Sequence, residues 1–444
     1  PEQVLVWNPD VIIALDPDFP KLAAADPLWN GLKAVREGRV HAIPTLPFGW
    51  VDAPPGVNRL IGLRWLAGLF FPEQFPQTLG DAVRDFYRRF YRIELTPAQL
   101  DRLLRDAAGA WRPLEDAPLC DLTAPWWNPH ISEKLSLGGK TYYATSAANL
   151  LMSVDTSAMY MNTRLAAEQG IDTKTLYQTV REGGWTFDLL EKYIENAAID
   201  VNGDGKMDKT DRYGLHCYDQ NIFATSYITA AGLDSLSKDE NDRLTVGWNN
   251  EAYMNAMEKA YELYHSPNAY MEDERHTATI FTEGRSLFMH GFFLAVDALE
   301  EMEDDYAILP IPKASETMED YLCANYDVMM FVMPRFVTDT ELFGAVTEWL
   351  SYEGLSHVRD AYIETTLKYK KARDSETAEM VQICLDASQV DLGSMYAFDF
   401  CGYDAIYVKV MLPNTYKFAS YAAGTEKSLV GRIEKIEKAV QGGE

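Results

Sequence analysis

Acidic and amide side chains recur between residues 200 and 211 at the spacing of a calcium-binding loop. Calcium takes six to eight oxygen ligands in one tight turn, and Gly205, at position 6 of the loop, permits the backbone reversal. Because Asp211 at position 12 is shorter than the usual glutamate, a metal-free surface turn is the alternative to a structural Ca²⁺. The predicted metal ligands are Asp200, Asn202, Asp204, Lys206, Asp208 and Asp211.

Aromatic residues are abundant, and several lie where a ligand could reach them. The chain has 10 Trp and 25 Tyr, and sugars bind by stacking on aromatic rings while planar polar groups pair with their hydroxyls. Trp126 and Trp127 precede Asn128 in a predicted loop, and Trp185 lies just before a predicted helix. Binding residues concentrate at such positions. The three indoles are therefore candidate sugar-binding groups, with packing as the alternative for each.

Motifs for catalysis do not occur in the sequence. The seven His include no H-x-x-x-H pair, and there is neither a glycine-rich phosphate loop nor a G-x-S-x-G motif. We therefore predict a binding protein and no enzyme. A glycosidase needs only two carboxylates at a fixed separation, which 67 acidic residues could supply, so a glycoside-active enzyme stays an alternative.

Charge is distributed unevenly along the chain. Residues 1–112 carry 13 acidic and 13 basic residues, whereas residues 113–444 carry 54 acidic and 27 basic ones and hold the whole net charge of −27. Such a step is a domain-level signal. The negative charge argues against nucleic acid and anionic membranes as ligands. No apolar run approaches the ~20 residues of a membrane helix, and five Cys without C-x-x-C spacing predict free thiols.

The first 112 residues predict a small α/β unit. Apolar runs at 11–15 and 40–44 are typical of buried strands, and helices are expected at 27–38, 58–70, 81–91 and 97–107. The stretches WNPDVIIAL, DPLWNGLKAVREGRVHAIP and FYRRFYRIELTPAQLDRLL resemble the C-terminal lobe of class III periplasmic binding proteins. The resemblance makes Phe48, Trp50 and Arg59 candidates for ligand-facing residues, with packing within the lobe as the alternative. A receptor for an iron complex, cobalamin or an oxyanion is therefore an alternative function.

Residues 113–444 resemble a second family of receptors. The stretches LCDLTAPWWNP, LSLGGKTYYA, MYMNTRLAAEQGID, GGWTFDLLEKYIENA, DVNGDGKMDKTDRYG and FTEGRSLF resemble, in this order, family 1 extracellular solute-binding proteins. These are the maltose-binding-protein-like receptors of carbohydrate ABC importers. The resemblance implies an extracytoplasmic receptor, in the periplasm or at the cell surface, with a lipid anchor in the full-length parent as one option. Its lobes are expected to close around an oligosaccharide, and a permease is expected to recognise the closed form. It implies further ligand contacts from Tyr143, Asn162, Arg285, Asp327 and Tyr403.

The same resemblance predicts how the second segment is divided. Strand-like runs at 153–161, 306–311 and 328–333 alternate with helical patterns at 187–197, 252–265 and 340–352, which favours α/β lobes of the periplasmic-binding-protein type. We expect an incomplete first lobe at about 113–150 and 277–315, and a second lobe at about 151–276 and 316–444. Since both segments lack part of their family's N-terminal side, the chain is predicted to be chimeric. Its start at Pro1 shows no signal peptide.

Overall fold

The computed structural model describes residues 2–14, 19–44, 51, 59–70, 79–91, 111–195, 197–271, 276–300, 302–326, 328–335, 337–364 and 375–441. They fall into two compact units, the first comprising Pro1–Trp111 and Pro334–Thr338, the second Arg112–Met333 and Asp339–Glu444. The predicted helix at 97–107 and the predicted ligand residues Phe48, Trp50 and Asp327 lie outside the described residues. Both units mix helices and strands, so the predicted α/β class is confirmed.

The first unit is built on two short parallel strands. β1 (Ile12–Ala14) pairs with β2 (Val40–Ala42), where the apolar runs predicted strands. Parallel strands need a crossover connection, which here contains α2 (Phe19–Ala25) and α3 (Lys33–Arg36). The predicted helix at 27–38 is shorter than expected, because the Asp26 carboxylate accepts from the backbone N–H of Leu28 (2.7 Å) and a turn precedes α3. The other helices described are α1 (Glu2–Trp7), α4 (Arg59–Phe70), α5 (Leu79–Phe86) and the π-helix η2 (Tyr87–Tyr91).

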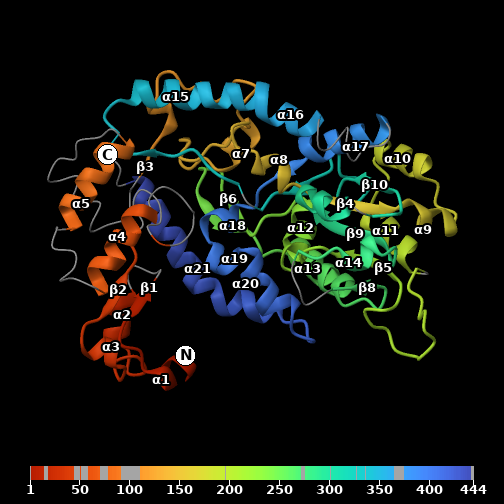
Figure 1. The fold of residues 1–444 in the computed structure, drawn as a ribbon, viewed down its shortest axis with the longest axis horizontal. Helices are drawn as coiled ribbons and strands as arrows, with labels where there is room; N and C mark the ends of the chain where they lie inside the picture. Colours follow the sequence, from red (N-terminus) through yellow and green to blue (C-terminus); the bar gives the residue numbers. More distant parts are fainter. Residues whose placement is uncertain are drawn as a thin grey trace. The chain divides into compact units, whose positions relative to one another are not determined.

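A five-stranded mixed sheet lies in the second unit (Figure 1), in the order β10-β4-β9-β5-β8. Its strands are β4 (Ser157–Asn162), β5 (Tyr213–Cys217), β8 (Ala269–Tyr270), β9 (Ser286–Phe292) and β10 (Tyr306–Leu309). β9 runs parallel to β5 and antiparallel to β4. β4, β5 and β9 are buried at every position. Burial on both faces explains why their sequences are largely apolar and do not alternate.

Side-chain caps decide where several helices around this sheet begin. The side chains of Asn162, Asp172 and Thr186 each accept from the backbone N–H three residues on, which satisfies a donor that the first turn leaves unpaired. They start α9 (Thr163–Glu168), α10 (Thr173–Arg181) and α11 (Phe187–Ile194). α9 contacts β9, α11 contacts β5, and α10 and α17 (Ser375–Asp386) contact β10.

The remaining helices of the second unit include α12 (Phe223–Ala230), which is buried at every position and packs on α13 (Glu251–Tyr264). The other α-helices are α7 (Pro129–Lys134), α8 (Leu151–Val154), α14 (Thr279–Thr282), α15 (Thr340–Glu353), α16 (Asp360–Tyr362), α18 (Leu392–Tyr396), α19 (Phe398–Cys401), α20 (Tyr403–Ile406) and α21 (Phe418–Gln441). The 3₁₀-helices are η3 (Leu114–Asp116), η4 (Gln220–Ile222) and η5 (Phe293–Leu299), and the π-helices are η6 (Gly354–Arg359) and η8 (Tyr407–Met411). No helix among the described residues has the length and apolarity to cross a membrane.

The short strands are β3 (Trp111–Arg112), β6 (Leu236–Lys238), β7 (Leu244–Val246), β11 (Cys323–Ala324), β12 (Met333–Pro334) and β13 (Ser388–Gln389). β11 pairs with β13 in parallel, and β6 with β7 antiparallel. The predicted strand at 328–333 is reduced to a single bridge between Phe331 and Ala144 and the start of β12. The predicted strand at 153–161 begins only at Ser157, because α8 occupies the residues before it.

The central sheet joins two stretches that the sequence assigned to different lobes. β9 and β10 lie in the stretch assigned to the first lobe, and both are hydrogen-bonded to β4, which was assigned to the second lobe. β9 is also bonded to β5. Residues 151–276 and 277–315 therefore contribute strands to one sheet, and the division into lobes stays a prediction.

Candidate functional site

Three parallel strands of the second unit end at the same edge of the central sheet. β5 runs parallel to both β8 and β9. The backbone N–H of Thr277 donates to the carbonyl of Tyr218 (3.3 Å), and that of Tyr218 donates to His290 (2.8 Å), so the segments at these three strand ends are joined. Ligands of open α/β sheets bind beyond the carboxyl ends of parallel strands. The side chains gathered here, named the edge cluster, are Tyr218, Asp219, Asn221, His276, Phe292, Tyr326, Tyr403 and Asp404.

Five aromatic rings of the edge cluster form a continuous series of contacts. Tyr218 stacks on His276, with 5.7 Å between ring centroids, and meets Phe292 edge to face at 5.4 Å. Tyr326 contacts Phe292 at 6.4 Å and Tyr403 edge to face at 5.8 Å. Tyr218 and Phe292 are buried, Tyr326 and Tyr403 are half-buried, and the His276 side chain is 53% exposed. The series therefore has an accessible side formed by His276, Tyr326 and Tyr403.

Polar side chains tie the segments of the edge cluster together. The Asp219 carboxylate caps η4 by accepting from the backbone N–H of Asn221 (3.0 Å), and its other oxygen lies 3.0 Å from Nε2 of His276. Nδ2 of Asn221 donates to Asp404 (2.6 Å), and the Tyr326 hydroxyl donates to the carbonyl of Ile222 (3.1 Å). Burial, reinforced by the charges of Asp219 and Asp297, raises the pKa of Tyr218. The Tyr218 phenol is therefore neutral and able to donate a hydrogen bond.

Three buried side-chain oxygens at or beside this edge have no hydrogen-bond partner among the described residues. They are Oδ1 of Asn221, Oδ1 of Asn325 and Oγ of Ser157. Ser157 lies opposite Phe292 in the sheet register, and Asn325 forms a bridge with Thr156. Buried polar groups are almost always paired. The structure leaves these oxygens without the partner that a buried polar group normally has, which makes the edge a candidate place for a ligand.

The edge cluster contains one of the ligand residues that the sequence predicted, Tyr403. Asp327 follows Tyr326 directly but lies outside the described residues. Tyr143 is half-buried and meets Tyr396, which is not part of the edge cluster, edge to face at 5.7 Å. Its neighbour Tyr142 is buried.

The predicted indoles occupy packing positions. The Trp185 side chain is fully buried, and its Nε1 donates to the carbonyl of Pro310 (2.8 Å). Trp127 is 4% exposed, and its Nε1 donates to Glu348 (2.8 Å). Trp126 is half-buried and donates to the same carboxylate (3.0 Å). Trp127 and Trp185 therefore pack inside the protein, the alternative that the sequence left open, whereas Trp126 keeps part of its surface exposed. The predicted stacking role stays a prediction.

Asn162 and Arg285 also serve the protein itself. Asn162 is fully buried, caps α9 through Oδ1, and donates through Nδ2 to Asp304 (2.8 Å). Arg285 pairs with Glu283 and donates to the carbonyl of Asp211 (3.4 Å). It precedes the first residue of β9, whereas the edge cluster lies at the last, about 20 Å away at the ~3.3 Å rise of a strand. These contacts lie apart from the edge cluster, and the predicted ligand role of Asn162 and Arg285 stays a prediction.

The predicted calcium loop is closed by its own hydrogen bonds. Asp200 accepts from the backbone N–H groups of Gly203 (2.7 Å) and Gly205 (2.8 Å). The fully buried Asp211 accepts from those of Val201 (2.9 Å) and Asp208 (2.8 Å). Within the described part of the chain, no three Asp, Glu, His or Cys side chains are grouped so that they could hold a metal ion. The carboxylates thus serve backbone donors, and calcium binding by this loop stays a prediction.

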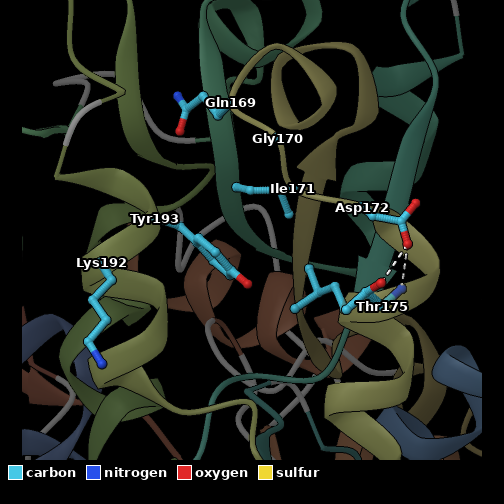
Figure 2. A pocket seen from close by; sticks show the side chains of 8 residues that line it. Gln169, Gly170, Ile171, Asp172, Thr175, Lys192 and Tyr193 are labelled. Atoms are coloured by element: carbon cyan, nitrogen blue, oxygen red, sulfur yellow. Dashed lines mark hydrogen bonds between the residues drawn. The ribbon is translucent and has the colours of Figure 1, made fainter.

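A pocket of about 490 Å³ lies apart from the edge cluster, between the α9–α10 turn and α11. It is lined by Gln169, Gly170, Ile171, Asp172, Thr175, Leu176, Lys192 and Tyr193. Figure 2 shows Tyr193 and Thr175 on opposite sides, with Ile171 between them. Asp172 accepts from the backbone and hydroxyl of Thr175 (2.8 and 2.7 Å), as the cap of α10. Because its carboxylate is used by the helix and no parallel strand ends here, the edge cluster is the better candidate site.

The signal that could have located the edge cluster lies in the sequence. The residues Tyr218-Asp219-Gln220-Asn221 follow directly on a buried strand, and polar and aromatic residues at that position are typical of a ligand-binding loop. The contribution of His276, Phe292 and Tyr326 carries no such local signal, because each meets the loop only through the fold.

Comparisons with known proteins give matches among solved structures only. Neither a family model nor a curated protein matches the sequence. UgpB from Mycobacterium tuberculosis, solved in complex with glycerophosphocholine, is 12% identical and matches over 96% of this chain and 98% of its own, with a TM-score of 0.50. The sugar-binding protein MalE from the phytopathogen Xanthomonas citri is 13% identical over 73% of this chain and 80% of its own, also with a TM-score of 0.50.

A third match is more similar in sequence but short. An ABC transporter solute-binding protein from Sulfurospirillum deleyianum is 36% identical over 22% of this chain, with a TM-score of 0.22, and the chain spans 31% of its length. The likeness to UgpB and MalE shows a fold of the maltose-binding-protein type. The incomplete lobe, the class III resemblance of residues 1–112 and the chimeric origin receive no support from these matches.

Proposed function

We propose that this protein is an extracytoplasmic solute-binding receptor of an ABC importer, and that it binds a carbohydrate at the edge cluster. The observation that carries the proposal is the unpartnered Oδ1 of Asn221, more than nine-tenths buried in a loop lined by Tyr326 and Tyr403. The fold shared with UgpB and with the sugar-binding protein MalE is consistent with such a receptor.

The chemistry of the edge cluster suits a sugar. Tyr326 and Tyr403 present half-buried rings on which the apolar face of a pyranose can stack. The side-chain carbonyl oxygen of Asn221, which has no partner among the described residues, accepts a hydrogen bond from a sugar hydroxyl. A pocket that combines aromatic walls with a few placed polar groups is the usual form of a small-molecule site.

The proposed mechanism is binding without turnover. The solute shifts the receptor toward a closed arrangement of its lobes, and the permease recognises this closed form. We place the receptor outside the cytoplasm, where a lipid anchor would keep it near the permease.

Isothermal titration calorimetry with malto-, cello- and chito-oligosaccharides, and with glycerophosphocholine, tests the proposal. Tyr403→Ala is expected to weaken binding of the best sugar about tenfold, the loss of roughly 1.4 kcal/mol of stacking. The control is Tyr407→Ala, which removes a half-buried tyrosine outside the edge cluster. If no sugar binds, or if the two variants bind equally, the proposal is wrong.

A further inference from the structure

The charged side chains of the edge cluster are mostly acidic. Asp219 and Asp404 are carboxylates, His276 is the one base, and the cluster as defined contains neither Lys nor Arg. Nε2 of His276 lies 3.0 Å from the carboxylate of Asp219, so this imidazole, when it is protonated, balances one of the two acids. The side chains of the cluster therefore carry a net negative charge.

Asn221 links the two acids through its donors. Its backbone N–H donates to Asp219 (3.0 Å), and its Nδ2 donates to Asp404 (2.6 Å). Its Oδ1 has no hydrogen-bond partner among the described residues, although only 7% of the residue is exposed. The amide oxygen and the carboxylates are all hydrogen-bond acceptors, so a ligand that meets them has to supply donors.

Two tyrosine rings form a corner beside this amide. The ring centroids of Tyr326 and Tyr403 are 5.8 Å apart and the ring planes meet at 89°, so their faces form two walls. The Tyr326 hydroxyl donates to the carbonyl of Ile222 (3.1 Å), the residue after Asn221, and Tyr403 directly precedes Asp404 at the start of α20. We name Asn221, Tyr326, Tyr403 and Asp404 the aromatic corner. It brings two ring faces, one unpartnered oxygen and one carboxylate together.

A further acid lies near the neighbouring ring of Tyr218. Asp297 belongs to η5, the helix that directly follows β9. A Cβ at Gly291 of β9 would lie 3.3 Å from Cβ of Tyr218 and 3.5 Å from Cβ of Ala295 on η5, so the ring and this helix approach the same backbone. Burial first, and then the charges of Asp219 and Asp297, raise the pKa of Tyr218. The electrostatic field is therefore negative next to the aromatic corner as well.

We propose that the solute carries a protonated amine and that the aromatic corner holds this ammonium group. This ligand class rests on the proposed function, and it makes the carbohydrate an amino sugar, such as a glucosamine oligomer. A cation is attracted to the electron-rich face of a tyrosine ring. An ammonium group also has three N–H donors and no acceptor. It therefore matches an amide oxygen and a carboxylate, whereas a sugar hydroxyl offers one donor and no charge.

The test compares a glucosamine oligomer with a cello-oligosaccharide of the same length and linkage, which differ only in carrying an ammonium or a hydroxyl group at C2. Isothermal titration calorimetry of the full chain at about pH 6, where sugar amines are largely protonated, measures both. We expect the glucosamine oligomer to bind about tenfold more tightly. Raising sodium chloride from about 50 to about 500 mM should reduce this preference, because salt screens charge.

The matched variants are Asp404→Asn and Asp399→Asn. Asp404→Asn removes the charge and keeps an oxygen that accepts from Nδ2 of Asn221, so the local hydrogen bond is preserved. We expect it to lower the preference for the glucosamine oligomer to about threefold or less. Asp399 is an exposed acid on α19 that pairs with Arg432 (2.7 Å) and is not part of the edge cluster. Asp399→Asn should keep the full preference.

Two results would overturn the assignment of an ammonium group. One is a cello-oligosaccharide that binds as tightly as the glucosamine oligomer or more tightly, in which case carbohydrate binding stands and the ligand is neutral. The other is a preference that high salt leaves unchanged, which is measured on the unmodified protein even if Asp404→Asn does not fold. If no sugar binds, charged or neutral, the proposed function itself is wrong and the amino sugar falls with it.

Discussion

The indole nitrogen of Trp127 lies 2.8 Å from Oε2 of Glu348, a residue 221 positions further along the chain. The same carboxylate accepts from the indole of Trp126 (3.0 Å) and from the backbone N–H of Asp121 (3.1 Å). Glu348 belongs to α15, so one side chain fixes the loop 121–127 to that helix. The tandem tryptophans, which resemble ligand-stacking residues in the sequence, are therefore held in place by a charged acceptor.

Removing this acceptor should destabilise the second unit. Glu348→Ala leaves two indole donors and a backbone donor unpaired, and we expect a loss of about 3 kcal/mol in the free energy of unfolding, because hydrogen bonds to charged groups are the stronger ones. Glu348→Gln keeps one carbonyl acceptor and should lose less. Urea unfolding measures both. The control is Glu353→Ala on the same helix. Glu353 pairs with the exposed His357, so its removal should change stability little. Equal effects of Glu348→Ala and Glu353→Ala would refute the argument.

Trp185 should matter for stability and not for ligand affinity. Trp185→Phe removes the donor to Pro310 and part of a fully buried ring that packs against Phe288. We expect a loss of about 2 kcal/mol on unfolding, from a small cavity and an unpaired carbonyl. Calorimetry should give the same dissociation constant for the sugar as the unmodified protein. If the folded Trp185→Phe protein binds the sugar more weakly, the prediction is wrong and Trp185 contributes to ligand binding.

His290 should make stability depend on pH. The ring is fully buried against Ser226 (2.8 Å) and Cys217, and this burial lowers the pKa of His290 from 6.5 to about 4. Its folded pKa is below its unfolded one, so protons bind the unfolded chain more readily. The effect of His290 on the free energy of unfolding is constant above about pH 6.5. As the pH drops from 6.5 toward 4, the free energy of unfolding decreases, by up to about 3 kcal/mol in total.

Unfolding by urea at several pH values measures this effect. Other groups titrate in the same range, so the informative quantity is the difference between the unmodified protein and His290→Gln, which keeps a polar side chain without the titration. The unmodified protein should lose stability faster between pH 6.5 and 4. Parallel curves for the two proteins would contradict the assignment.

Calcium should bind the loop of residues 200–211. The ion would replace hydrogen bonds that the carboxylates now make with the loop backbone, so we expect binding heat and a higher unfolding temperature. Asp204→Ala should weaken both effects, while Asp188→Ala, an exposed acid on α11, should leave them intact. Calorimetric titration with calcium measures the binding heat. The absence of heat at millimolar calcium would rule out a calcium site in this loop.

Local patterns predicted those parts of the fold that depend on neighbours in sequence. The apolar spacing at 252–265 and 340–352 corresponds closely to α13 and α15, and the runs at 11–15 and 40–44 to β1 and β2. The boundaries that were missed have local causes too. α8 precedes β4 because Leu151–Val154 form a helical turn, where the apolar run alone favoured a strand.

The candidate site was predicted only at Tyr403. Arg285 and Asn162 have the polar chemistry of ligand residues, yet their side chains are used to bind the backbone of Asp211 and to cap α9. Trp185 has the ring of a stacking residue, yet the fold buries it completely. The type of a side chain determines which groups it can bind. Its neighbours in the folded protein determine whether it is free to bind a ligand.

The sequence by itself determined the α/β class, the charge step at residue 112 and the composition of a binding protein rich in aromatic residues, because these follow from residue types and short-range spacing. Only the tertiary structure decided which residues share a site. Tyr218, His276, Phe292, Tyr326 and Tyr403 come from five separate segments. The first three lie at or beyond the ends of β5, β8 and β9, which run parallel, while Tyr326 follows β11 and Tyr403 opens α20. That register is fixed by backbone hydrogen bonds between distant segments, which no local pattern encodes.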